Sequence, residues 1–80
     1  MSSYLLEHRH EADDCPVVFA SWRGFSSPLR HRVTFASCAM GGHRIWWRVE
    51  AAHEAEALSY LPTYVADRTA ATQIADLQIP

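Results

Sequence analysis

The chain has 80 residues, of which 49% are hydrophobic, and it carries a formal net charge of −2 at pH 7. This length and composition predict a single small domain over residues 1–80 and exclude a disordered chain. The absence of a basic cluster argues against nucleic acid as a partner, and no apolar run approaches the roughly 20 residues that span a membrane.

The N-terminus does not read as a signal peptide, so we expect a cytoplasmic protein whose cysteines stay reduced. The first predicted element is a strand over residues 3–10, SYLLEHRH, with alternating side chains. One side of it carries Tyr4, Leu6, His8 and His10, and the other carries Leu5, Glu7 and Arg9. Residues 11–25 then predict a helix, capped by one of the acids at 13 and 14 and closed by Gly24.

Residues 29–38, LRHRVTFASC, predict a second strand, and the double glycine in AMGGH predicts a tight turn after it. HRIWWRVE, residues 43–50, predicts a third strand that returns along the second. One face of it carries Ile45, Trp47 and Val49, and the other carries Arg44, Trp46 and Arg48. The two middle strands should therefore form a hairpin.

Residues 51–69 predict a second helix with a break near Leu61-Pro62, because proline ends or kinks a helix interior. Residues 71–80 predict a fourth strand. The resulting βαββαβ order is that of a ferredoxin-like α+β fold. We expect a four-stranded antiparallel sheet in the order 4-1-3-2, with two helices on one face.

This topology collects five potential metal ligands at one edge of the sheet, namely His8, His10, Cys15, Cys38 and His43. Residues two apart on a strand point the same way about 6.6 Å apart, so two histidines can lean toward one ion. We predict a metal site built on His8 and His10, with His43 and Cys38 as further ligands. Imidazole and thiolate ligands suit nickel, zinc or copper.

A simpler interpretation is that the histidines are solvated and the cysteines pack as small hydrophobic residues. The spacing matches no established metal motif such as CxxC or HExxH. Cys15 falls in a first helical turn, where packing is the usual role.

The uncovered face of the sheet carries Trp46 between Arg44 and Arg48. A large aromatic side chain there favours a homodimer that packs sheet to sheet and encloses a cavity. The alternative is that the arginine stems lie along Trp46 and shield it from water.

Three segments of the chain, YLLEHRH, CAMGGHRIWWRVEAAHEAEAL and YLPTYVADRTAATQIADLQIP, resemble small bacterial proteins of the dimeric α+β barrel superfamily. Within it the chain is similar to short actinobacterial proteins and to nickel-binding ferredoxin-like proteins. The resemblance implies a homodimer with a cavity between facing sheets. Metal-binding relatives use histidines of the early strands, which here are His8 and His10.

Other members of this superfamily use the cavity for heme handling or cofactor-free oxygenation, for which His31, Trp46 and Tyr64 would be the polar groups available. The first hypothesis is therefore a small metal-binding protein that is not an enzyme. The second is a small-molecule-binding barrel or cofactor-independent monooxygenase. In it a histidine acts as base, and the ligand contacts His31, Arg44, Trp46 and Arg48. The third is a dimer with no chemistry of its own.

Overall fold

Four strands form one antiparallel sheet in the computed structural model, which describes residues 1–80. They are β1 (Ser2–Arg9), β2 (Phe35–Ala36), β3 (Arg44–Ala51) and β4 (Thr69–Ile74). Their order across the sheet is β2-β3-β1-β4, which reads β4-β1-β3-β2 from the other edge. The predicted α+β class and four-stranded antiparallel sheet are thus confirmed.

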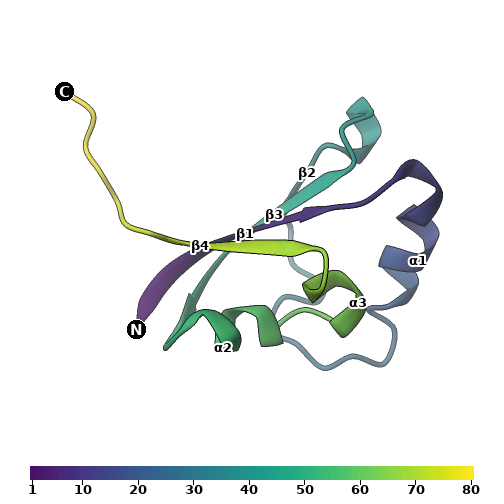
Figure 1. Cartoon of the computed structure of the whole chain (residues 1–80), viewed down its shortest axis with the longest axis horizontal. Helices are drawn as coiled ribbons and strands as arrows, with labels where there is room; N and C mark the ends of the chain where they lie inside the picture. The colour runs from purple at the N-terminus through teal and green to yellow at the C-terminus, as the bar shows by residue number, and fades with distance from the viewer.

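The helices are short and lie on one side of the sheet (Figure 1). They are α1 (Cys15–Ala20), α2 (Glu54–Ser59) and α3 (Thr63–Ala66), with 3₁₀ turns η1 (Ala12–Asp14) and η2 (Cys38–Met40). The predicted break at Pro62 is confirmed, since α2 ends before Pro62 and α3 begins after it. Proline has no N–H to continue α2, but its carbonyl accepts from Ala66 N at 2.8 Å and so starts α3.

The second predicted strand is wrong over most of its length, because only Phe35–Ala36 pairs with β3. Residues 29–32 turn instead, with Arg30 N donating to the Ser27 carbonyl at 3.3 Å. His31 has a φ of 64°, a left-handed conformation that an extended strand does not contain. The alternating pattern was therefore overridden by turn hydrogen bonds that begin at the preceding serine-proline loop.

Two other predicted boundaries are too long. The first α-helix ends at Ala20 and continues as turns to Gly24, whose φ is 74°. The fourth strand is Thr69–Ile74 rather than 71–80. It stops where β1 runs out of partners, since Ser3 already pairs with Ile74, and residues 75–80 extend away from the body (Figure 1).

The core lies between the sheet and the helices, and the predicted alternation of the strands supplies most of it. Its ten buried hydrophobic residues are Tyr4, Leu6, Val18, Ile45, Trp47, Val49, Ala51, Ala57, Leu61 and Val65. Only 13 of 80 residues are buried in total, so this core leaves little margin of stability. No helix is long and apolar enough to cross a membrane.

Candidate metal centre

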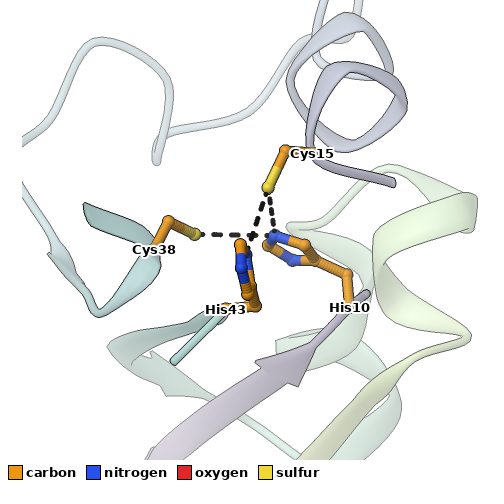
Figure 2. Close-up of side chains that lie close together, drawn as sticks. All are labelled: His10, Cys15, Cys38 and His43. Carbon is orange, nitrogen blue, oxygen red and sulfur yellow. Dashed lines mark hydrogen bonds between the residues drawn. The ribbon is translucent and has the colours of Figure 1, made fainter. Parts of the chain in front are cut away.

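Two histidines and two cysteines meet at one end of the sheet (Figure 2). They are His10 just after β1, Cys15 at the start of α1, Cys38 at the start of η2, and His43 just before β3. One ligand atom from each, an imidazole nitrogen or a thiol sulfur, lies within 4.8 Å of the other three. Figure 2 shows all four side chains directed at a common point.

Local backbone structure brings these residues together. His10 N donates to the His43 carbonyl at 3.2 Å, which ties the end of β1 to the start of β3. Pro16 occupies the first turn of α1 next to Cys15. Gly42 closes the turn between Cys38 and His43, where a side chain would collide with Ser37.

The contact distances fit a tetrahedral ion. Cys15 Sγ lies 3.1 Å from His10 Nε2 and 3.3 Å from His43 Nδ1, and Cys38 Sγ lies 3.5 Å from His10 Nε2. With metal–nitrogen and metal–sulfur bonds of about 2.0 and 2.3 Å, the nitrogen–sulfur edge of a tetrahedron is about 3.5 Å. These three nitrogen–sulfur distances match that edge within a few tenths of an ångström, and all four atoms lie within 4.8 Å of one another.

The surroundings of Cys38 and His10 favour the neutral forms of these two groups. Burial raises the pKa of the Cys38 thiol, and the neighbouring Cys15 adds to that shift. Burial also lowers the pKa of His10, and the nearby His43 lowers it further, while Asp14 acts in the opposite direction. Two thiols and two imidazoles whose ligand atoms converge suit a cation, which would displace the thiol protons as it binds.

A polar cavity of about 260 Å³ lies beside His10, lined by Arg9, His10, Glu11, Asp14 and Arg68. Cys15, Cys38 and His43 are half-buried, and His10 is buried. The acids at 11 and 14 are matched in this cavity by the guanidinium groups of Arg9 and Arg68.

The structure brings together three of the four predicted ligands, His10, Cys38 and His43, but replaces the fourth. Cys15, for which packing was the expected role, is a member of the cluster, and His8 is not. A signal for Cys15 was present in the chain: His10 and Cys15 are separated by four residues, and so are Cys38 and His43. These mirrored H-x₄-C and C-x₄-H pairs flank two short turns that fold against each other.

His8 is fully buried immediately behind the cluster. Its Nδ1 lies 3.2 Å from the Val65 carbonyl and 3.3 Å from Thr69 Oγ1. Its ring centroid is 5.1 Å from that of His10. Burial lowers the pKa of His8, and His10 lowers it further. The predicted shared orientation of the two histidines therefore holds, but only His10 reaches the cluster.

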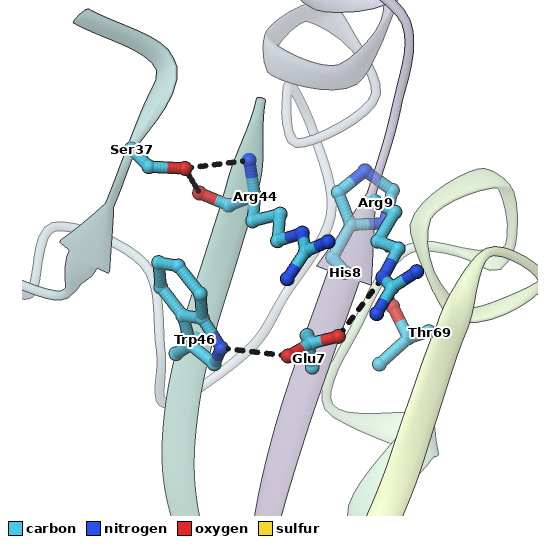
Figure 3. A network of polar contacts seen from close by, with 7 residues as sticks. All are labelled: Glu7, His8, Arg9, Ser37, Arg44, Trp46 and Thr69. Carbon is cyan, nitrogen blue, oxygen red and sulfur yellow. Dashed lines mark hydrogen bonds and ion pairs between the residues drawn. The ribbon is translucent and has the colours of Figure 1, made fainter. Parts of the chain in front are cut away.

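The residues predicted to contact a small-molecule ligand do not form one site. Arg44, Trp46 and Arg48 lie on the uncovered face of the sheet, where Trp46 Nε1 donates to Glu7 at 3.0 Å (Figure 3). Arg48 pairs with Asp76 at 3.0 Å. Tyr64 lies on α3, with the Arg68 guanidinium 3.8 Å above its ring.

His31, in contrast, lines a groove on the helix side of the sheet. The groove has a volume of about 290 Å³, and its walls are mostly apolar or aromatic. Its basic residues are Arg30, His31 and Arg32. Sequence reasoning missed this groove because it depends on the turns that replace the predicted strand at residues 29–34.

Comparison with known proteins adds no family to these observations, since no family model, curated protein or solved structure matches the chain.

Proposed function

We propose that this protein is a small zinc-binding protein whose Cys₂His₂ site is structural and not catalytic. The observation that carries the proposal is the spacing of four ligand atoms within 4.8 Å of one another. Structural zinc sites use four protein ligands of this kind, whereas catalytic sites leave one position for water or substrate. His10, Cys15, Cys38 and His43 fill all four positions.

The size of the core supports a structural role. Domains this small commonly need a metal or a disulfide to be stable. Here α1 supplies a single fully buried core side chain, Val18. An ion bound by Cys15, Cys38 and both histidines would fasten α1 and the η2 turn to the end of β1.

Zinc is the metal that this ligand set fits best among nickel, zinc and copper. A tetrahedral set of two sulfur and two nitrogen atoms is typical of zinc, whereas nickel and copper(II) favour square-planar or tetragonal nitrogen and oxygen ligands. Copper(I) shares the preference for thiolates and is therefore the competitor to test.

The test is elemental analysis of untagged protein, followed by titration of metal-free protein with zinc, nickel and copper(I). We expect one zinc per chain. Cys15→Ser should lower the zinc affinity by about 100-fold or more, because it removes one of the four ligands. This residue is chosen because Cys15 is the ligand that distinguishes this site from one built on His8. Cobalt(II) should give the strong visible absorption of a tetrahedral thiolate site.

The matched control is His31→Asn, which removes an exposed histidine outside the cluster and tolerates a left-handed backbone. It should bind zinc as the wild type does. Absence of zinc binding by the wild type, or unchanged binding in Cys15→Ser, would exclude the proposed site.

We also propose that the chain forms a homodimer through the uncovered face of the sheet, as in the dimeric α+β barrel proteins that it resembles. Support comes from Phe35, which is 80% exposed and pairs across the strands with Trp46. Leu5 on β1 adds a further exposed apolar side chain. Trp46→Asp should give a monomer by light scattering, and a persistent dimer would place the interface elsewhere.

A second candidate function is binding of a small aromatic carboxylate in the groove next to His31. Trp22, Trp47 and Phe19 provide flat apolar walls, and the rim carries Arg30 and Arg32 without an acidic residue. These two guanidinium groups contact only backbone carbonyls, so a ligand carboxylate could pair with them. Indole-3-acetate should bind measurably by calorimetry and indole-3-acetamide more weakly. Equal affinity for both would exclude recognition of the carboxylate.

A further inference from the structure

We infer that His8 is the hydrogen-bond acceptor that holds His10 in its metal-binding form. This inference rests on the proposed metal site and adds a positioning residue behind it. Two nitrogen atoms carry it, His8 Nε2 and His10 Nδ1. They are the only buried side-chain nitrogen or oxygen atoms of the chain without a hydrogen-bond partner.

The contacts of His8 determine which of its nitrogens carries the proton. Thr69 Oγ1 donates its single hydrogen to the Val65 carbonyl at 2.7 Å. Both oxygens within reach of His8 Nδ1, at 3.2 and 3.3 Å, are therefore acceptors. Nδ1 must carry the proton, which leaves Nε2 of the neutral ring as a buried acceptor with nothing to accept.

The contacts of His10 also place its proton on Nδ1, but in this ring the protonated nitrogen is the one without a partner. Its Nε2 is the atom directed at Cys15 and Cys38, so a metal would bind there. Nε2 must then be free of hydrogen, and the proton lies on Nδ1. His10 Nδ1 is thus a buried donor with nothing to receive its hydrogen.

The unpaired acceptor and the unpaired donor belong to neighbouring rings. The ring centroids are 5.1 Å apart, and the planes are inclined by 33°. A linear N–H···N bond of about 2.9 Å between two imidazoles places their centroids about 5 Å apart. The observed spacing of the two rings is therefore that of a directly hydrogen-bonded imidazole pair. Histidine ligands generally need such an acceptor for their second nitrogen.

The test compares two substitutions of one residue by zinc titration of the full chain. His8→Phe keeps the volume and removes both nitrogens. His8→Gln also loses the ring contacts but keeps a carbonyl oxygen near the position of Nε2. We expect His8→Phe to weaken zinc binding about 10- to 100-fold, the usual effect of losing such a partner. His8→Gln should recover most of that loss, and both should keep one zinc per chain and the wild-type cobalt spectrum.

Nitrogen NMR of the zinc-loaded wild type gives a measurement that does not depend on how well the variants fold. We expect zinc on His10 Nε2, an exchange-protected proton on His10 Nδ1, and no proton on His8 Nε2. A proton on His8 Nε2 would overturn the inference, and so would equal affinity of His8→Phe and wild type.

The outcomes also separate this inference from the proposal beneath it. If the wild type binds no zinc, the proposed function fails and the role of His8 falls with it. If the wild type binds zinc and His8→Phe changes the stoichiometry or the cobalt spectrum, His8 is a ligand and the inference is wrong, while a metal site of different composition remains.

Discussion

The sheet carries two clusters of polar side chains, one on its uncovered face and one at its edge. They differ in whether the chain itself supplies their hydrogen-bond and charge partners. On the uncovered face, Glu7 accepts from Trp46 Nε1 and from Arg9 Nε, each at 3.0 Å (Figure 3). Both oxygens of this carboxylate have a donor, and its negative charge has a cationic partner. The carboxylate of Glu7 is thus satisfied within the chain, and its hydrogen bonds lower the pKa of Glu7.

The Cys/His cluster at the edge of the sheet, in contrast, lacks some of these partners within the chain. Its four members are all weak acids or bases of similar kind, with no charge partner among them. The shifts of Cys38 and His10 disfavour the charged forms, and His10 and the adjacent His8 each keep an unpaired nitrogen. A cation would satisfy this group. The comparison therefore predicts that added zinc changes the edge and leaves the open face unchanged.

The largest effect should be on thermal stability. Zinc at a 1,000-fold excess over its Kd stabilises the folded chain by about 4 kcal/mol. In a domain of 80 residues this corresponds to a rise in Tm on the order of 15 °C or more. Scanning calorimetry with zinc and with a chelator measures the difference.

Cys38→Ser should abolish this rise, and Glu7→Gln should retain it in full. A similar zinc-dependent rise in Cys38→Ser would show that the ion binds outside the cluster. Loss of the rise in Glu7→Gln would show that the two groups are coupled.

The sequence predicted those elements whose structure is determined by residues close together in the chain. The alternation in β1 and β3 correctly separated the two faces of each strand, and Pro62 identified the break between α2 and α3. The strand expected at residues 29–38 failed because Ser27 and His31 form turns. These turns are closed by local hydrogen bonds, and Ser27 Oγ anchors them to the rest of the fold by donating to the Tyr60 carbonyl at 2.6 Å, a contact between residues far apart in the sequence.

The metal site was also predictable only in part. Topology alone placed His10, Cys38 and His43 at one edge. The choice between Cys15 and His8 depends on side-chain direction, because both lie close to that edge. His8 turns its Nδ1 toward α3 and β4, whereas Cys15 begins α1 and faces the β2–β3 turn. Strand periodicity cannot show such a difference of a few ångströms.

A smaller effect is expected behind the metal site. Thr69→Val should destabilise the chain by about 1 kcal/mol, because it removes the hydroxyl that contacts both His8 and the Val65 carbonyl. Thr72→Val on the exposed side of β4 is the matched control and should be close to neutral. Denaturant unfolding measures both, and equal effects would assign the loss to strand propensity alone.

The smallest effect concerns the pKa of Glu7 on the open face. The hydrogen bond from Trp46 is the main cause of the lowered pKa, ahead of that from Arg9. Trp46→Phe should therefore raise the pKa of Glu7 toward its ordinary value of 4.5, and Arg9→Gln should raise it less. Carbon NMR titration of the carboxylate measures both changes, and a larger rise in Arg9→Gln would reverse the order of causes.

The sign of the linked stability follows from the direction of this shift. A carboxyl whose pKa is lower in the folded state stabilises the fold above its unfolded pKa. That contribution is lost as the pH falls from 4.5 through the folded value. Trp46→Phe should accordingly flatten the decline of stability in this acid range. Zinc should leave the Glu7 titration unchanged, because the open face already holds every partner that Glu7 uses; a zinc-dependent pKa would mean that the edge and the face respond as one unit.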